Sequence, residues 1–355
     1  MSLQVYKIAQ LAMPELKTFV DVGANRGFIG SMLIGMWGGH EHRITPAVVS
    51  NHSLALDLYP NNRNPFGYCR TGLNHAYPIY CPEGRRKGKG ECMIKRDVRV
   101  FSIDGSSNLK RQVGSVIRDL DASRLWSYDN YAISNTIGFT QFTRQNATHM
   151  SGLEGGTLNA KGDTETVPMT TIDAFLEEAG FTGVVDVIKI DAESHDLVGL
   201  LVPTALHNAP GLCTHYAPNP HSSTHTPAHT LQGARKTIER GTKIITYEHS
   251  RVANFTLGRK AWEMFRELKF SCYSAAFKLL YKMDLECLEG TWLHNIMKFD
   301  WGNIYCASQV HAPAVVAAFD AISFLPIRAH EKTLALEAKA AAAEKSERLL
   351  VRGGR

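Results

Sequence analysis

The sequence predicts an α/β fold in which helices cover both faces of a mostly parallel sheet. Short apolar runs that end in an acidic residue or a glycine recur along the chain, and helical patterns lie between them. Continuous apolar runs are typical of strands buried on both faces of a parallel sheet, and their alternation with helices is typical of a doubly wound sheet. Seven runs predict a seven-stranded sheet: 17–23, 99–104, 131–134, 184–191, 243–248, 270–277 and 303–307.

The clearest helical pattern covers residues 170–180. A threonine stands at the cap position, Ile172, Phe175 and Leu176 follow at helical spacing, and Gly180 fits the C-terminal stop. Weaker patterns predict two further helices over residues 193–200 and 258–268.

Composition restricts the class of protein. The chain of 355 residues, 44% hydrophobic and 21% charged, can bury a core. Its net charge of +5 is too small to indicate a nucleic-acid partner. No apolar stretch approaches the roughly 18 to 20 residues that a membrane span needs. Seven cysteines, an odd number, favour a reducing compartment over a disulfide scaffold, so we expect a soluble, cytoplasmic protein.

The pattern divides the chain into three parts. We expect residues 1–17 to form a helical lead-in, residues 18–310 the main domain, and residues 311–355 a helical, Ala-rich tail. The stretch 35–92 contains many Pro, Gly, Asn and Arg residues where a compact fold needs only a short connection, and 201–230 lacks both helical and strand periodicity; we interpret both as insertions. The second is either a lineage-specific loop or a translated intron.

A glycine-containing loop follows the first predicted strand. Glycines allow close backbone approach to a ligand, and the following helix begins with unpaired N–H groups. The Gly-x-x-x-Gly spacing differs from the Gly-x-Gly-x-x-Gly of dinucleotide-binding enzymes, and an acidic residue just before the loop suits a ligand with an ammonium. An ordinary strand–helix turn is the alternative. The candidate cofactor-binding residues here are Asp21, Gly23, Ala24, Asn25 and Gly27.

Further candidates stand at the ends of later runs. Asp104 is placed to accept hydrogen bonds from ribose hydroxyls, although a helix N-cap is an equal alternative. Ser134 ends the third run and is a further cofactor-binding candidate. Asp191, Glu193 and His195 follow the strongest run, at the edge of the sheet where ligands of open α/β folds bind.

Lys189 is unusual because it lies inside a strongly apolar run. An unpaired buried ammonium is costly, so a carboxylate partner is required, and Glu248 at the end of the next run is one candidate. Glu193 is alternatively a first-turn acid favoured by the helix dipole, and His195 a surface residue. We expect no metal site, since prolines interrupt the spacing of His221, His225 and His229 and the cysteines lack paired spacing.

Five segments together resemble one known family. In order they are FVDVGANRGFIG, VPMTTIDAFLEEAG, VVDVIKIDAESHDLVGL, LQGARKTIERG and IITYEHS, and they cover most of residues 18–255. They resemble the FkbM family of S-adenosylmethionine-dependent methyltransferases. Two departures are Ser194, where that family has glycine, and Asp196, where it has glutamate.

The resemblance implies a Rossmann-like class I methyltransferase fold with S-adenosylmethionine as cofactor. It implies that Asp21 and the glycine loop line the donor site, that Asp104 meets the ribose, and that Asp191 and Glu193 face the reacting centre. It further implies methyl transfer to a hydroxyl of a sugar or other small molecule, hence a small-molecule or glycan acceptor.

The choice of base and of function class stays open. Asp191, Glu193 or His195 could take the acceptor proton. An NAD-dependent oxidoreductase is one alternative function, against which the Gly-x-x-x-Gly spacing counts. A non-catalytic binding protein that kept the fold is another.

Overall fold

A computed structural model describes residues 2–38, 44, 48–49, 86–87, 91–92, 97–144, 152–153, 163–191, 231, 233–250, 261, 263–276, 279–283 and 301–323. The predicted helix over residues 193–200, with Glu193 and His195, lies outside these residues. So do the stretch 201–230, most of 35–92 and the tail from residue 324 onward.

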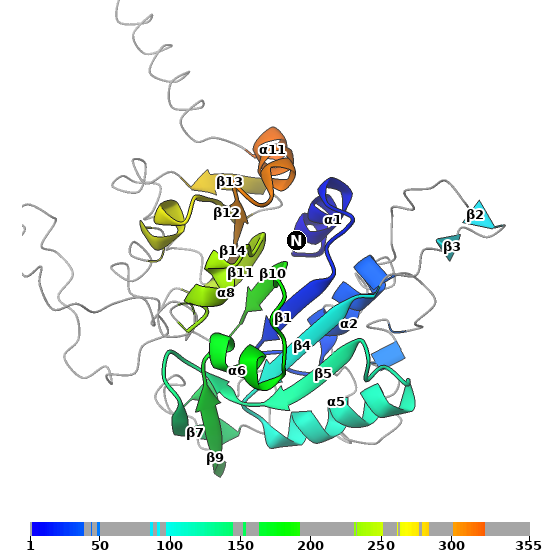
Figure 1. Ribbon diagram of the computed structural model, residues 1–355, viewed down its shortest axis with the longest axis vertical. Coiled ribbons are helices and arrows are strands. Elements are labelled where there is room, and N and C mark those ends of the chain that lie inside the picture. The colour runs from blue at the N-terminus through cyan, green and yellow to red at the C-terminus, as the bar shows by residue number, and fades with distance from the viewer. Residues whose placement is uncertain are drawn as a thin grey trace, which may run out of the picture.

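A large sheet forms the centre of the described structure, in the order β13-β12-β14-β11-β10-β1-β4-β5 (Figure 1). Neighbours among β5, β4, β1, β10 and β11 are parallel, whereas β14, β12 and β13 join by antiparallel pairing. The predicted α/β class with a mostly parallel sheet is therefore confirmed. The strands are β1 (Thr18–Val22), β4 (Arg99–Asp104), β5 (Trp126–Asn130), β10 (Val187–Ile190), β11 (Ile244–Ser250), β12 (Phe270–Ala276), β13 (Leu279–Met283) and β14 (Trp301–Ser308).

The large sheet differs in two details from the seven-stranded sheet that the sequence predicts. In the described residues it has eight strands. The third parallel strand is β5, just before the predicted run 131–134, in which Ala132–Ile133 forms β6 of a separate sheet. The additional strand is β13, at the opposite edge. Both β5 and β13 are edge strands with mixed polar and apolar residues, so a search for continuous apolar runs misses them.

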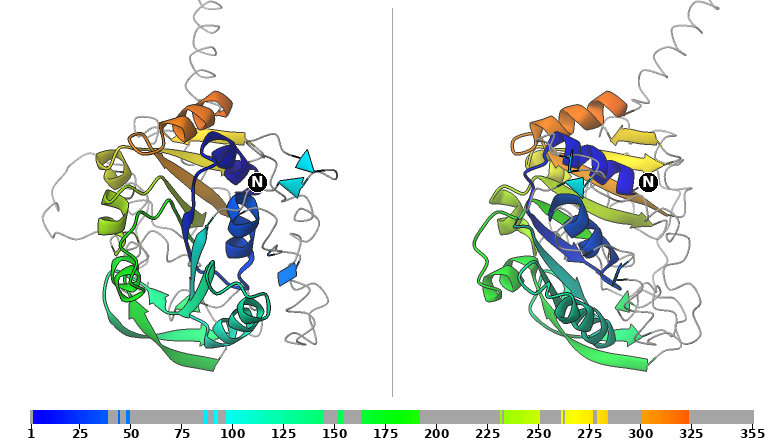
Figure 2. Two further views of the ribbon diagram at one scale, coloured as in Figure 1. Left: turned by 45° about the vertical axis from the view of Figure 1, so that its right-hand side comes forward. Right: turned by 90° about the vertical axis from the view of Figure 1, so that its right-hand side faces the viewer.

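A small sheet has the order β6-β9-β7-β8 and lies beside α5 near the β5 edge (Figures 1 and 2). It holds the turn that follows β4. The ring of Phe142 lies over Gly105, so closely that a Cβ added to this glycine would be 2.5 Å from the ring. Ser107 Oγ donates a hydrogen bond of 2.6 Å to Glu165 Oε2. Besides β6, the strands of this small sheet are β7 (Gly138–Arg144), β8 (Gly152–Leu153) and β9 (Asp163–Thr170).

Helices cover both faces of the large sheet (Figure 1). Because side chains alternate along a strand, Phe19 of β1 packs under the first layer and Val20 under the second. The first layer contains α1 (Ser2–Ala12), α2 (Phe28–Leu33), the π-helical turn η1 (Ile34–Gly38), α5 (Ser107–Asp119) and α11 (Pro313–Ile322). The second contains α6 (Ile172–Glu178) and α8 (Arg235–Glu239). A two-strand ladder, β2 (Arg86–Lys87) with β3 (Glu91–Cys92), stands apart from these layers.

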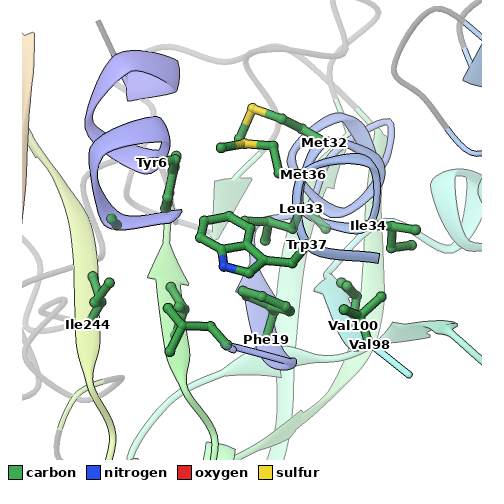
Figure 3. Close-up of a cluster of buried hydrophobic side chains, with 14 of the residues drawn as sticks. Tyr6, Phe19, Met32, Leu33, Ile34, Met36, Trp37, Val98, Val100 and Ile244 are labelled. Atoms are coloured by element: carbon green, nitrogen blue, oxygen red, sulfur yellow. The ribbon is translucent and has the colours of Figure 1, made fainter. Parts of the chain in front are cut away.

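Trp37 belongs to the core under the first layer (Figure 3). Its ring lies 5.2 Å from that of Phe19, measured between centroids, and its indole N–H donates to the carbonyl of Met13 at 3.3 Å. The residue stands at the start of the stretch predicted as an insertion. The core therefore continues past α2 before the chain leaves the described residues.

Helix α6 confirms the predicted helix over residues 170–180. Thr171 caps its N-terminus, because its hydroxyl oxygen accepts a hydrogen bond of 3.0 Å from the Ala174 N–H. Gly180 has a φ of 65°, the left-handed conformation that suits glycine after a helix.

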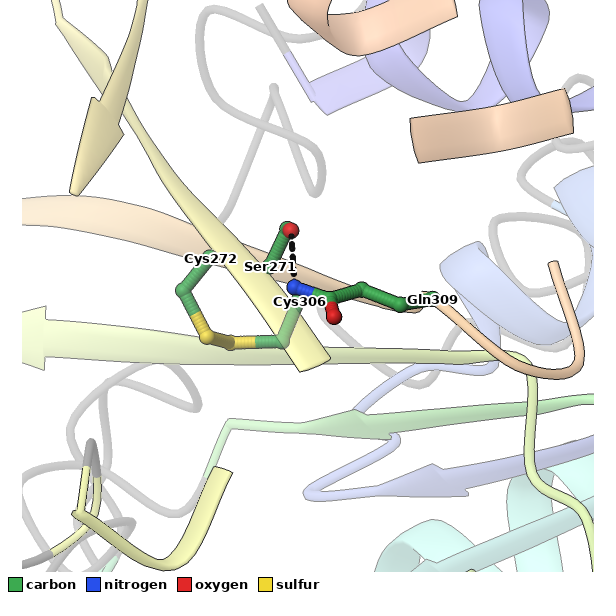
Figure 4. Close-up of a disulfide and its surroundings, with 4 residues drawn as sticks. All are labelled: Ser271, Cys272, Cys306 and Gln309. Atoms are coloured by element: carbon green, nitrogen blue, oxygen red, sulfur yellow. Dashed lines mark hydrogen bonds between the residues drawn. A yellow bond between two sulfur atoms is a disulfide. The ribbon is translucent and has the colours of Figure 1, made fainter. Parts of the chain in front are cut away.

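Cys272 of β12 and Cys306 of β14 are cross-strand partners, and a disulfide joins them (Figure 4). Gln309 Nε2 donates to Ser271 Oγ at 3.0 Å beside them. The composition favours free thiols, but strand pairing places these two cysteines opposite one another although 34 residues separate them. Among the residues that the structure describes, no helix is long and apolar enough to cross a membrane.

Candidate active site at the carboxyl edge of the sheet

The parallel strands β5, β4, β1, β10 and β11 follow the Rossmann order 3-2-1-4-5 when they are numbered along the chain. The strand order therefore reverses between β1 and β10. In open α/β sheets, ligands bind outside the carboxyl ends of the strands at this switch point. The candidate residues at the ends of β1, β4 and β10 consequently share one edge.

A row of polar residues crosses the sheet just below this edge. Asp21 pairs in register with Ser102 on one side and Lys189 on the other, and Lys189 pairs with Thr246. Alternation along each strand points all four towards the first helical layer. All four are buried. We call Ser102, Asp21, Lys189 and Thr246 the polar row.

Lys189 lies at the centre of the polar row. Its Nζ is 3.1 Å from Asp21 Oδ1 and 3.2 Å from Asp191 Oδ2. It also donates to the carbonyls of Val22 at 3.2 Å and Gly23 at 3.1 Å. The two aspartates thus supply the carboxylates that a buried lysine requires, whereas the candidate Glu248 forms a hydrogen bond with Asp191.

The two aspartates that share Lys189 differ in environment. Burial raises the pKa of Asp21, although Lys189 opposes the shift. Burial also acts on Asp191, but Lys189 and the hydrogen bond with Glu248 outweigh it and lower the pKa. Burial alone would lower the pKa of Lys189, yet the two aspartates outweigh it and raise the pKa. At neutral pH Lys189 is therefore an ammonium, and Asp191 is a carboxylate.

The backbone conformation of the loop after β1 explains which residue types it contains. Gly23, Asn25 and Gly27 have φ values of 65°, 47° and 73°, all in the left-handed region. Glycine adopts it freely, and asparagine is among the side chains that tolerate it best. A Cβ added to Gly27 would lie 2.6 Å from the Trp126 ring. The Gly-x-Asn-x-Gly pattern is thus what a tight turn against Trp126 requires.

Backbone hydrogen bonds tie this loop to β4. The Ala24 N–H donates to the Ile103 carbonyl at 3.1 Å, and the Asn25 N–H donates to Asp104 Oδ2 at 2.9 Å. The Gly27 N–H donates to the Ala24 carbonyl at 2.9 Å. These three N–H groups have partners within the protein and shape the loop.

Asp104 connects the loop with the turn after β4. Its second oxygen, Oδ1, accepts from the Ser106 N–H at 2.9 Å. The N-cap of α5 is Ser106, whose hydroxyl oxygen accepts from Leu109, so Asp104 is not the cap. Asp104 is half-buried, and burial raises its pKa to about 6. Each carboxylate oxygen can accept a second hydrogen bond, which leaves capacity for ribose hydroxyls.

Ser134 lies apart from these residues in its described contacts. Its N–H donates to the Thr170 carbonyl at 2.8 Å. Its own carbonyl faces Gly233, where an added Cβ would be 2.2 Å away. Ser134 therefore lies in the seam between the small sheet and the second helical layer, and its role in cofactor binding stays a prediction.

Two residues near the site carry no signal in the sequence. Tyr6 of α1 lies 2.8 Å from Thr246 by their hydroxyl oxygens, and burial raises the pKa of Tyr6 to about 12. Tyr128 donates its hydroxyl to the Asn25 carbonyl. Both contacts join parts of the chain that are distant in sequence. Within the described ranges, no three His, Cys, Asp or Glu side chains come together as metal ligands do.

Comparison with protein families gives one match. The family model described as the methyltransferase FkbM domain matches residues 21–272. This range contains the glycine loop, Asp104, Lys189 and Asp191. No curated protein matches the chain.

Solved structures give similarities at low sequence identity. One is a “putative O-methyltransferase” from Klebsiella pneumoniae, with 9% identity, a TM-score of 0.35, and coverage of 87% of this chain and 80% of that one. Another is precorrin-6y C5,15-methyltransferase from Geobacter metallireducens GS-15, with 7% identity, a TM-score of 0.31, and coverage of 86% and 88%.

Proposed function

Because the chain belongs to the FkbM methyltransferase family, we propose that it transfers a methyl group from S-adenosylmethionine to a hydroxyl of a sugar or other small molecule. The Rossmann-like class I methyltransferase fold supplies the framework. The observation that carries the choice of donor is the charge at the switch point, where carboxyl groups surround a single lysine.

S-adenosylmethionine is a net cation, since its sulfonium and ammonium outweigh its carboxylate. Asp21, Asp191 and Asp104 all interact electrostatically with Lys189, and Glu248 bonds to Asp191. At neutral pH Asp191 and Asp104 are carboxylates beside one ammonium, so the edge keeps a negative charge and attracts a cation. A nicotinamide dinucleotide would instead bring an anionic pyrophosphate to the same place. The charge therefore favours the methyl donor over NAD.

The residues present fit the donor. Asp104 is half-buried and retains acceptor capacity for the ribose hydroxyls. The Asp191 side chain is 37% exposed and can meet the donor ammonium, whereas that of Asp21 is 0% exposed and faces Lys189. Asp21 therefore positions other groups, and Asp191 is the carboxylate that contacts the ligand. Gly23 and Gly27 allow the backbone close approach.

The bound donor supplies a methyl group already activated for displacement by its sulfonium. The protein then needs to align an acceptor oxygen and remove its proton. Asp191 was one of three candidates for this base, but Lys189 lowers its pKa and thereby weakens it as a proton acceptor. Glu193 and His195 lie beyond the described residues and remain candidates for the same step.

Calorimetry tests the donor, with S-adenosylhomocysteine and NAD titrated separately into the wild-type protein. We expect binding of the first and none of the second. Asp191→Asn should weaken S-adenosylhomocysteine binding, while Asp97→Asn, an exposed aspartate just before β4, should leave it unchanged. A folded protein that binds NAD instead would refute the proposal.

Methyl transfer is tested with labelled S-adenosylmethionine and a panel of sugars and other hydroxyl compounds. Labelled product that survives base treatment, as an ether does, supports transfer to oxygen. Donor binding without transfer to any acceptor over the full panel would support the non-catalytic alternative.

A further inference from the structure

The Lys189 ammonium is surrounded by more hydrogen-bond acceptors than it has N–H groups. An ammonium has three N–H donors, and four oxygens lie within 3.2 Å of this one: Asp21 Oδ1, Asp191 Oδ2 and the carbonyls of Val22 and Gly23. Its side chain is only 10% exposed. Its hydrogen-bonding capacity is thus used inside the protein, and a ligand carboxylate cannot claim it.

The Val22 carbonyl joins the two strands at the switch point. It accepts from Lys189 Nζ and, at 3.1 Å, from the Asp191 N–H. The backbone and the side chain of Asp191 are therefore both fixed relative to the end of β1. One backbone carbonyl and one ammonium determine where this carboxylate lies.

The two carboxylates in contact with Lys189 have different partners. Asp21 Oδ2 accepts from the Gly30 N–H at 3.1 Å and its side chain is fully buried. Asp191 is 37% exposed and bonds to Glu248. Without the ammonium, two neighbouring carboxylates would compete for a proton, because like charges at such distances cannot both remain ionised cheaply.

We propose that Lys189 is a positioning residue for the donor site, whose ammonium holds the exposed Asp191 carboxylate charged and fixed beside the carbonyls of Val22 and Gly23. This inference rests on the proposed function, because it assigns Asp191 to the donor ammonium. The ammonium fixes the position and the ionised form of Asp191, so a carboxylate is available to a cationic ligand. The structure thus separates the group that contacts the donor from the group that controls it.

Other ionisable groups face the same site. Asp104 lies on β4, Glu248 on β11, and the Tyr6 hydroxyl reaches the polar row from α1. A change at Lys189 alone would also leave Asp21 as a fully buried charge, and such a variant can fail to fold. The test therefore removes the lysine and its buried partner together.

The variants D21N and D21N/K189M form the matched pair. Both variants lack the Asp21 charge, and they differ in whether the Lys189 ammonium remains beside Asp191. With Lys189 the folded pKa of Asp191 is below its unfolded value, so its stabilising contribution is complete above about pH 4. Without Lys189 the pKa of Asp191 rises, because only the hydrogen bond with Glu248 then opposes the effect of burial, and stability is lost as the pH rises through that higher pKa.

Thermal unfolding without ligand gives the first readout. We expect the melting temperature of D21N/K189M to fall relative to that of D21N between pH 4 and pH 7. If Lys189 had a merely structural role, the double variant would melt at a temperature lower by the same amount at every pH. Parallel curves of melting temperature against pH for the two variants would therefore overturn the inference. If the double variant does not fold, the inference is tested in the wild type by an NMR titration of the Asp191 carboxyl carbon. A pKa of Asp191 at or above the usual value of about 4 would overturn the inference.

Binding gives the second readout. S-adenosylhomocysteine affinity should be similar for the two variants at pH 8, but about tenfold weaker for D21N/K189M at pH 5.5. Equal affinities at both pH values would contradict a role in donor binding. Wild-type protein that binds no S-adenosylhomocysteine, together with diverging melting curves, would refute the proposed function while supporting the control of Asp191 by Lys189.

Discussion

The two edges of the central sheet carry the same pair of residue types in opposite arrangements. At the amino edge, Asp186 precedes β10, and its Oδ2 accepts from the N–H groups of Lys17 at 2.8 Å and Thr18 at 3.0 Å. Its other oxygen pairs with Lys243. At the carboxyl edge, Lys189 donates to the carbonyls of Val22 and Gly23 and contacts two aspartates.

The backbone explains this difference. Parallel strands present N–H groups where they begin and carbonyls where they end, so the amino edge suits a carboxylate and the carboxyl edge suits an ammonium. One acid and one lysine balance at the amino edge. At the carboxyl edge several acids lie near one lysine, and we propose that Asp191 and Asp104 offer negative charge to a ligand there. We therefore expect the Asp186–Lys243 pair to stabilise the fold alone, and the Lys189 cluster both to stabilise the fold and to support the proposed site.

The largest effect is expected at the amino edge, from Asp186→Ala. This change leaves two backbone N–H groups and Lys243 without their acceptor, so it should lower the free energy of unfolding by about 3–5 kcal/mol. Urea denaturation measures it. S-adenosylhomocysteine affinity of the folded fraction should not change, and a selective loss of affinity would show that the two edges are not separate in function.

A loss of ligand affinity is expected from Asp104→Asn at the carboxyl edge. Loss of the charged acceptor for the ribose should weaken S-adenosylhomocysteine binding about 10- to 100-fold, as removal of a hydrogen bond to a charged group does. Asp97→Asn, an exposed position at the amino end of the same strand, is the control. Calorimetry compares the two, and equal affinities would remove Asp104 from the donor site.

The pH dependence of binding sharpens the comparison further. Burial raises the pKa of Asp104 to about 6, and under the proposed function ribose hydroxyls would bind its ionised form. Affinity should therefore be complete above pH 6 and fall by up to about tenfold per pH unit below it. Asp104→Asn should remove most of this dependence. An unchanged profile in that variant would assign the titration to another group.

The smallest effect is expected from Tyr6→Phe, which removes the hydroxyl partner of Thr246. A single buried hydrogen bond contributes about 0.5–1.5 kcal/mol to the free energy of unfolding. A double-mutant cycle with Thr246→Val isolates the pair. S-adenosylhomocysteine affinity should stay unchanged, whereas a clear loss would extend the donor site to α1.

Local signals predicted much of the structure around the carboxyl edge of the sheet. The apolar runs of β1, β4, β10 and β11, the Thr171 cap and the glycine loop each depend on neighbouring residues, so the sequence alone reveals them. The lysine inside the β10 run correctly indicated a carboxylate partner. The identity of that partner depended on strand order and register, which place Asp21 beside Lys189 although 168 positions separate them.

Other features have no local signal. The edge strand β5 has mixed polarity, and the small sheet pairs residues 138–144 with 163–170 across a long connection. The Tyr6–Thr246 contact spans 240 residues, and the disulfide depends on the register of β12 and β14. Each of these is decided by tertiary packing, which a periodicity search cannot see.

The small sheet has a consequence for how such a protein diverges. Phe142 covers Gly105 and Glu165 binds Ser107, so the turn that carries Asp104 takes its shape from residues of a different sheet. Under the proposed function, substitutions in β7 or β9 should change donor affinity by moving that turn, while every residue at the switch point stays the same. Related proteins would then differ in their affinity for the methyl donor through substitutions in the small sheet. A comparison restricted to the binding residues would not detect this difference.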